Sequence, residues 1–216
     1  MSPQYLFHRD FVLEVAIAAA VFVLVTAAML FAVVWFRRRP GREPSHSHSH
    51  PKLETAYGLV VAAVAIFLVV NSITTNGERL AAKPAVQINV TAFQWCWRFQ
   101  YAGVGGITPP GPTITGRCVG GDVPTAEVPV GKVVRFTVTS DDVIHAFWIP
   151  YLKYKTYAYP GHVNSFDATF AEPGTYEGRC AEFCGLYHSD MEFRIRAVPV
   201  GEYTTWLAQR PSSPAT

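Results

Sequence analysis

A short stretch near the C-terminus combines sulfur and nitrogen side chains at close spacing. It reads Cys180-Ala-Glu-Phe-Cys184-Gly-Leu-Tyr-His188-Ser-Asp-Met191, so two cysteines, a histidine and a methionine fall within one loop. Thiolates combined with imidazole favour copper, and a weak axial methionine tunes the reduction potential of copper sites. The stretch therefore predicts a copper site.

Zinc is the main competing metal, because thiolate and imidazole are also its usual ligands. A thioether adds little to a zinc site, so Met191 favours copper. A further ligand candidate is His145, which lies 35 residues before Cys180 in an apolar segment. A lone histidine in such a strand is more often a core residue. Beside the cysteine loop we expect it to be the ligand that a copper site in a β-sandwich draws from a distant strand.

The elements that would position these ligands are short strands. After Pro84 apolar residues alternate with polar ones, for example at Val134, Phe136 and Val138, as in strands with one buried face. Residues 193–197 alternate in the same way. Further candidate strands are residues 86–91, 95–101, 126–130, 144–149, 164–170 and 175–179.

Glycine and proline turns separate these strands, which predicts an all-β Greek-key sandwich or barrel over residues 84–200. We expect an irregular excursion over residues 103–121, which are rich in Gly, Pro and Thr. The C-terminal tail, residues 201–216, is predicted to contain a short helix around Glu202–Gln209.

Two long apolar segments precede this domain. Residues 11–36 contain one charge, Glu14, and residues 56–73 contain none. As a helix the first segment would reach about 39 Å, enough to cross a hydrocarbon core of about 30 Å. We predict transmembrane helices over residues 11–36 and 56–75, with a linker at 76–83. A cleaved signal peptide is the alternative for the first segment, but its apolar run is too long and no cleavage site follows it.

The loop between the helices, residues 37–55, is basic: it carries Arg37, Arg38, Arg39, Arg42 and Lys52. The positive-inside rule predicts a cytoplasmic loop, with residues 1–10, the C-terminus and the β domain on the outer, periplasmic side of a bacterial plasma membrane. The loop also contains His46, His48 and His50. A cytoplasmic metal site is one interpretation of these histidines, and a solvated linker is the one we favour.

The ligand candidates together resemble a known motif. The residues His145, Cys180, Glu182, Cys184, His188 and Met191 are similar, in type and spacing, to the CuA motif of cytochrome c oxidase subunit II. The resemblance extends over the helices and implies a cupredoxin-like fold for the β domain. It implies a binuclear copper centre bridged by the two cysteines, with one histidine on each copper. Met191 and the carbonyl oxygen of Glu182 would be weak ligands.

The resemblance also implies three roles outside the copper ligands. The carboxylate of Glu182 would reach a Mg²⁺ or Mn²⁺ ion shared with subunit I. Trp95, in the stretch Gln94-Trp95-Cys96-Trp97, would lie over the copper site and receive the electron. Glu54 would lie near the entry of a proton-uptake path. The alternatives are a solvated loop carboxylate, an aromatic core residue and an interfacial carboxylate, respectively.

The function implied is electron entry into a haem–copper oxidase. Electrons from cytochrome c or a small copper protein would pass to the haem of subunit I, where oxygen is reduced to water with proton translocation. We expect no haem in this chain, since residues 11–36 and 56–73 contain no histidine and the sequence has no C-x-x-C-H motif. The net charge of +2 does not favour a nucleic-acid partner.

Three other functions compete with this one. A quinol oxidase subunit would lack the copper ligands. A membrane-anchored copper chaperone or thiol reductase would need alternating helices and strands, and a nitrous-oxide reductase would need a large propeller domain. The sequence pattern after Pro84 favours none of them.

The remaining two cysteines, Cys96 and Cys118, also fall in the predicted outer domain. Free thiols there would capture copper or oxidise. A disulfide would close a loop of about 20 residues and stabilise the domain by roughly 3 kcal/mol. The alternative is a buried free Cys96 with an exposed Cys118. We predict the disulfide.

Overall fold

The computed structural model describes residues 3–37, 41, 49–77, 80, 83–102 and 111–210. The chain forms two compact units: a helical unit of residues 8–77, and a β unit of residues 78–216 that includes the first seven residues. The predicted loop residues Arg38, Arg39, Arg42, His46 and His48 lie outside the described residues, as do residues 103–110 of the predicted excursion.

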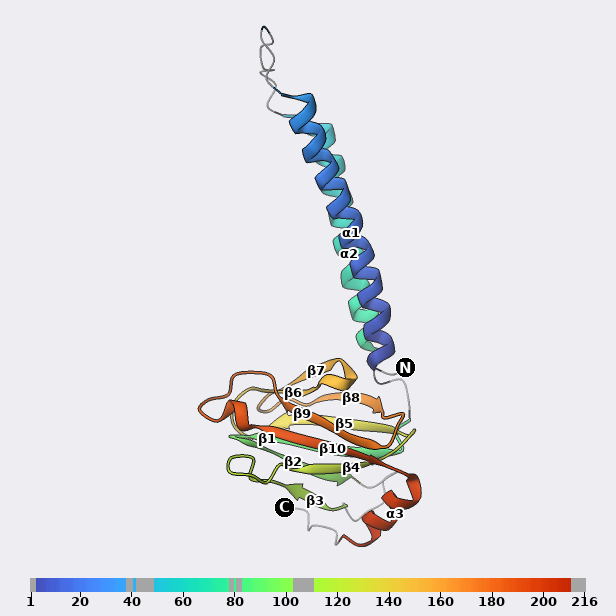
Figure 1. The fold of residues 1–216 in the computed structure, drawn as a ribbon, viewed down its shortest axis with the longest axis vertical. Coiled ribbons are helices and arrows are strands. Elements are labelled where there is room, and N and C mark those ends of the chain that lie inside the picture. The colour runs from blue at the N-terminus through green and yellow to red at the C-terminus, as the bar shows by residue number, and fades with distance from the viewer. Residues whose placement is uncertain are drawn as a thin grey trace. The chain divides into compact units, whose positions relative to one another are not determined.

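The helical unit contains two long helices (Figure 1). Helix α1 spans Pro3–Trp35 and α2 spans Pro51–Gly77. Both are long and apolar enough to cross a membrane, by length and composition. Each begins before its predicted span, so α1 includes His8, and α2 has Pro51 in its first turn, where the missing N–H of proline costs no hydrogen bond.

Polar contacts join the beginning of α1 to the end of α2. The carboxylate of Asp10 accepts a hydrogen bond from the side-chain amide of Asn71 at 3.4 Å. The guanidinium of Arg9 donates to the hydroxyl of Thr75 at 2.5 Å. Such contacts help to pair apolar helices, because lipid supplies no hydrophobic drive for helix association. The two helices therefore form the predicted hairpin.

The described part of the β unit contains two five-stranded sheets that face each other (Figure 1). In spatial order, the first sheet contains β3 (Thr113–Thr115), β2 (Cys96–Ala102), β1 (Val86–Phe93), β5 (Val133–Ser140) and β8 (Asn164–Thr169). The second contains β4 (Thr125–Pro129), β10 (Glu192–Val198), β9 (Gly174–Cys180), β6 (His145–Ile149) and β7 (Tyr154–Ala158). The β1–β5 and β4–β10 pairs are parallel, and the other neighbours are antiparallel.

The core lies between the two sheets and follows the predicted alternation. Strand β5 buries Val134, Phe136 and Val138, and β10 buries every second residue from Phe193. The ring of Phe147 on β6 stacks on that of Phe193, with centroids 4.2 Å apart. This apolar packing holds β6 and β10 in place on either side of β9, and it confirms the predicted sandwich.

Two strands differ from the expectation. Strand β3 is a three-residue edge strand inside the stretch predicted to be irregular. Strand β7 shows no clear apolar alternation, because its buried positions are Thr156 and Ala158 while its tyrosines are only partly buried. Two short 3₁₀ turns, η3 (Pro150–Leu152) and η4 (His188–Asp190), interrupt the loops. Helix α3 (Val200–Ala208) confirms the short C-terminal helix.

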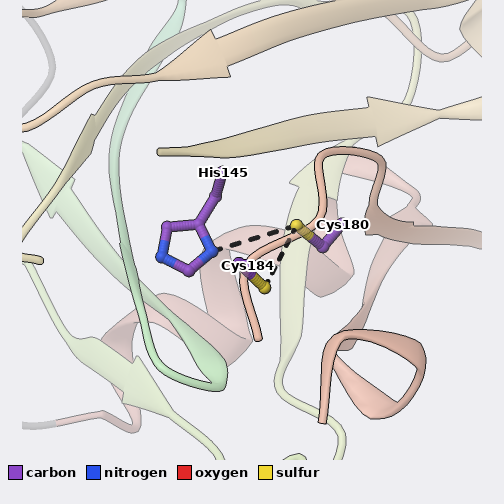
Figure 2. Close-up of side chains that lie close together, drawn as sticks. All are labelled: His145, Cys180 and Cys184. Atoms are coloured by element: carbon purple, nitrogen blue, oxygen red, sulfur yellow. Dashed lines mark hydrogen bonds between the residues drawn. The ribbon is translucent and has the colours of Figure 1, made fainter. Parts of the chain in front are cut away.

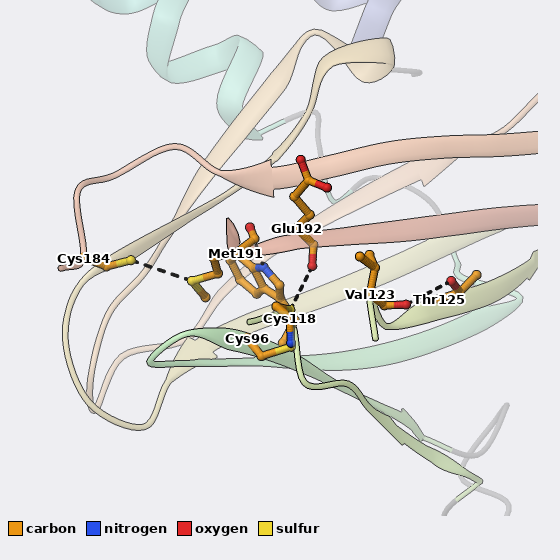
Figure 3. Close-up of a disulfide and its surroundings, with 8 residues drawn as sticks. Cys96, Cys118, Val123, Thr125, Cys184, Met191 and Glu192 are labelled. Atoms are coloured by element: carbon orange, nitrogen blue, oxygen red, sulfur yellow. Dashed lines mark hydrogen bonds between the residues drawn. A yellow bond between two sulfur atoms is a disulfide. The ribbon is translucent and has the colours of Figure 1, made fainter. Parts of the chain in front are cut away.

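The predicted disulfide is present. Cys96 at the start of β2 is bonded to Cys118, and their Cα atoms are 5.2 Å apart (Figure 3). The main-chain N–H of Cys118 donates to Sγ of Cys96 at 3.1 Å. Sγ of Cys118 lies 3.1 Å from the carbonyl oxygen of Glu192, the first residue of β10. The bridge therefore joins the start of β2 to the segment around Cys118, which lies against the start of β10 in the second sheet.

Replacing both Cys96 and Cys118 by serine is expected to lower the free energy of unfolding. The bridge spans 22 residues. Without it the unfolded chain gains conformational entropy, which lowers the free energy of unfolding by about 3 kcal/mol. The measurement is denaturant unfolding of the detergent-solubilised chain, followed by tryptophan fluorescence. Peptide mapping without reductant should recover the linked pair from the parent chain. Equal unfolding free energies would contradict the prediction.

Candidate metal centre

The sulfur and nitrogen donors gather at one end of the sandwich, where β6 begins and β9 ends. His145 is the first residue of β6, and Cys180 is the last of β9. The two strands are antiparallel, and the N–H of Ala181 donates to the carbonyl of Ala146 at 3.0 Å. This pairing places the His145 imidazole beside the Cys180 thiol (Figure 2).

The remaining donors lie on the loop of residues 181–191, which we call the ligand loop. Its two ends meet, because the N–H of Cys180 donates to the carbonyl of Met191 at 2.9 Å. Between them the 3₁₀ turn η4 begins at His188. The loop therefore folds back over the end of β9, and Cys184, His188 and Met191 converge on Cys180.

The donor atoms form a continuous chain of contacts. Sγ of Cys180 lies 3.9 Å from Sγ of Cys184 and 3.9 Å from Nδ1 of His145. Sγ of Cys184 lies 3.5 Å from Nδ1 of His188 and 3.7 Å from Sδ of Met191 (Figure 3). The carbonyl oxygen of Glu182 lies 3.2 Å from Sγ of Cys180. The structure thus brings all six predicted ligand residues together.

These distances suit donors that share metal ions. Two ligand atoms on one tetrahedral ion, at metal–ligand bonds of 2.0–2.3 Å, lie roughly 3.3–3.8 Å apart. The two sulfur atoms stand in the middle of the set, and each has an imidazole and a weaker donor beside it. Two thiolates, two imidazoles and a thioether form a soft donor set, which fits copper better than zinc.

The environment acts differently on the two cysteines. Burial opposes the thiolate of Cys180, but hydrogen bonds from His145 and from backbone N–H groups outweigh it and lower the pKa. Burial and the neighbouring Cys180 raise the pKa of Cys184 to about 12. For His145 burial favours the neutral ring, yet Cys180 and Asp142 raise its pKa. Metal binding at this centre must therefore displace a proton from Cys184.

Two tryptophans contact the ligand loop. The indole N–H of Trp95 donates to the carbonyl of Cys184 at 3.2 Å, and its ring meets Tyr187 edge-on at a centroid distance of 5.0 Å. Trp95 is half-buried in the turn between β1 and β2. Trp97 is fully buried, and its indole N–H donates to the carbonyl of Met191 at 3.4 Å. Trp95 thus lies against the metal centre with part of its ring exposed.

The sequence pattern did not identify two polar residues of this site. Asp142 contacts the Nε2 atom of His145 at 2.8 Å, and the side-chain amide of Gln94 donates to the carbonyl of Cys184 at 2.7 Å. The position of Asp142, three residues before the candidate ligand His145, was the one local signal available. Gln94 had none, since its partner is 90 residues away along the chain.

Glu54 belongs to the helical unit. Its carboxylate accepts a hydrogen bond from the main-chain N–H of His50 at 2.8 Å, in the first turn of α2. A carboxylate at this position stabilises a helix through the free N–H groups and the positive end of its dipole. A structural role therefore accounts for its position, and the proton role stays a prediction.

Comparison with known proteins gives the family. Residues 86–198 match the family model described as cytochrome c oxidase subunit II, periplasmic domain. The chain belongs to the cytochrome c oxidase subunit II family. This finding confirms the resemblance seen in the sequence and the two-helix, cupredoxin-like fold class.

Individual members of the subunit II family are similar over most of the chain. The "Probable cytochrome c oxidase subunit 2" of Streptomyces avermitilis is 33% identical, over 89% of this chain and 71% of that protein. The cytochrome c oxidase subunit 2 of Alkalihalophilus pseudofirmus is 30% identical, over 93% of this chain and 57% of that protein. The chain thus spans little more than half the length of the second relative.

A solved structure supports the fold of the β unit. The crystal structure of the periplasmic domain of cytochrome oxidase subunit II from Bradyrhizobium japonicum aligns with a TM-score of 0.53 and 32% sequence identity. The alignment covers 60% of this chain and 95% of that domain. The β unit is therefore similar to a domain that carries the same family name.

A glycine permits the close contact between the ligand loop and the β1–β2 turn. Gly185 has φ +120°, and a Cβ atom there would lie 3.1 Å from the indole nitrogen of Trp95 and 3.2 Å from the amide nitrogen of Gln94. Gly121 has a similar φ of +131° with no atom within 4 Å of the corresponding position. The two positions share a positive φ that only glycine adopts without strain, and they differ in how crowded an added Cβ would be.

Gly185→Ala is therefore expected to lower the free energy of unfolding more than Gly121→Ala does. Both variants incur left-handed backbone strain of about 1–2 kcal/mol, and only Gly185→Ala also pushes Trp95 and Gln94 away. Denaturant unfolding of the metal-free chain measures the difference. Equal losses in the two variants would show that the ligand loop does not pack tightly on Trp95.

Proposed function

We propose that this chain is the electron-entry subunit of a haem–copper cytochrome c oxidase. It accepts electrons from an external donor, cytochrome c or a small copper protein, at a binuclear copper centre. It passes them to the haem of subunit I, where oxygen is reduced to water and protons cross the membrane. The observation that carries the proposal is the pair of thiols 3.9 Å apart, each flanked by an imidazole.

Copper bound at this site supplies a one-electron store shared between two metal ions. Cys180 and Cys184 would bridge the ions, and His145 and His188 would hold one each. Met191 and the carbonyl oxygen of Glu182 would be the weak ligands. The ends of the ligand loop are hydrogen-bonded to each other and to β6, which keeps the donor atoms in place when the charge of the centre changes.

Trp95 is the entry point for the electron. Its side chain is half-buried, and its indole N–H donates to the carbonyl of Cys184, a residue that would bridge the metal ions. That bond is a short route from the protein surface to a ligand. Trp97 is fully buried and cannot meet an external donor.

The partners follow from the same proposal. Subunit I binds the chain in the membrane through α1 and α2, and the β unit with both termini lies on the outer side. The partly exposed Glu182 carboxylate contributes to a Mg²⁺ or Mn²⁺ site shared with subunit I. Glu54 at the start of α2 lies at the entry of a proton path.

The full chain loaded with copper is expected to bind two copper ions and to give the EPR spectrum of one electron shared by two copper nuclei. The reason is that the two central thiolates must bridge, since each has its own imidazole neighbour. Metal analysis and EPR provide the measurement. A four-line spectrum from a single copper, or preferential retention of one zinc ion, would contradict the proposal.

Trp95→Phe is expected to slow reduction of the copper centre by the donor, by at least tenfold, with copper content and spectrum unchanged. The variant loses the hydrogen bond to the Cys184 carbonyl and the indole itself. Stopped-flow reduction measures the rate. Trp206→Phe is the matched control, because Trp206 on α3 packs on Tyr101 and Tyr203. Equal rates in the two variants would leave Trp95 a packing residue.

A further inference from the structure

The Asp142 carboxylate is fixed by hydrogen bonds from two separate loops. Its Oδ1 atom contacts Nε2 of His145 at 2.8 Å and accepts the N–H of Val143 at 2.6 Å. Its Oδ2 atom accepts the main-chain N–H of Gln94 at 2.6 Å. The hydroxyl of Ser140 also lies 3.3 Å from Oδ1, but it donates its single proton to the carbonyl of Val143 at 2.5 Å. Two main-chain N–H groups and the His145 ring therefore fix the position of this carboxylate.

This arrangement decides which nitrogen of His145 faces the sulfur ligands. The ring is fully buried, and each of its nitrogens has a protein group beside it. Because a carboxylate accepts hydrogen bonds, Nε2 carries the proton that is shared with Asp142. Nδ1, the atom 3.9 Å from Sγ of Cys180, is then the nitrogen that binds metal once it gives up the proton that it shares with this sulfur. Metal-binding histidines recurrently have such a partner on the remote nitrogen.

Gln94 links this arrangement to the ligand loop. Its main chain holds Asp142, and its side-chain amide donates to the carbonyl of Cys184 at 2.7 Å. The same carbonyl accepts the indole N–H of Trp95 at 3.2 Å. One turn of the first sheet thus contacts both the segment before His145 and the loop that contains Cys184.

We propose that Asp142 is a positioning residue of the metal centre, which holds His145 as an Nδ1 donor and is itself held by the Gln94 main chain. This inference rests on the proposed copper function. An anionic partner makes the imidazole a stronger donor and stabilises the oxidised, more positive centre. Asp142 therefore lowers the reduction potential of the centre.

The neighbouring Asp141 provides a matched control. It pairs with Arg98 at 3.1 Å, and its side chain is 52% exposed, against 30% for Asp142. Asp141→Asn removes the same charge one residue away without touching His145. A through-space effect of charge, or a role in docking a basic donor, would appear in both variants.

The experiment compares the copper-loaded full chain with its Asp142→Asn, Asp142→Ala and Asp141→Asn variants. The readouts are copper content, midpoint potential, and the pulsed-EPR signal of the remote histidine nitrogens. We expect both Asp142 variants to keep two copper ions, to shift the potential upward and to change the remote-nitrogen signal of one histidine. Asp141→Asn should change neither the potential nor the signal.

Two results would overturn the inference. One is a potential shift in Asp142→Asn no larger than in Asp141→Asn, with an unchanged nitrogen signal. The other comes from the parent chain alone and needs no folded variant. It is a pulsed-EPR spectrum in which the remote nitrogen of neither ligand histidine has the signal of an N–H that is hydrogen-bonded to a carboxylate. Failure of the copper proposal is distinguishable, because the parent chain would then lack the two-copper spectrum.

Discussion

The hydrogen bond between the N–H of Cys180 and the carbonyl of Met191 closes the ligand loop. Because Cys180 and Met191 are hydrogen-bonded to each other, the three ligand residues between them lie on a short, closed segment. Strand β9, which ends at Cys180, lies between β6 and β10. His145 therefore comes from the neighbouring strand on one side, and the chain leaves the ligand loop into β10 on the other side. The aromatic core beneath the site keeps these three strands in register.

The first sheet contributes none of the six predicted ligand residues, yet it contacts the loop that carries most of them. Its β1–β2 turn presents Gln94 and Trp95 to the ligand loop, and the disulfide at the start of β2 approaches β10. Both sheets thus meet near the ligand loop through polar contacts, in addition to the apolar core. A rigid frame of this kind suits the proposed electron-transfer role, in which the centre changes its charge without changing its shape.

Local patterns were sufficient for much of this structure. Alternation identified the buried faces of β5 and β10, long apolar runs identified the hairpin, and spacing identified the ligand loop. Strand β7 was not predicted, because its buried positions are Thr156 and Ala158 and therefore form no apolar alternation. The roles of Gln94 and Asp142 were not predicted, because a hydrogen bond between loops that are 48 residues apart produces no periodic pattern in the sequence. Such contacts exist only once the sandwich has formed.

Under the proposed copper function, the four cysteines of the chain need two opposite redox states within one domain. Cys96 and Cys118 form a disulfide, whereas Cys180 and Cys184 are free and would have to stay reduced to bind metal. With their sulfur atoms 3.9 Å apart, the second pair needs only a small movement to form a bond that would exclude copper. Because the first pair is already joined, the chain has no spare thiolate to reverse that reaction by exchange. Repair of an over-oxidised metal-free chain therefore requires a reductant from another molecule.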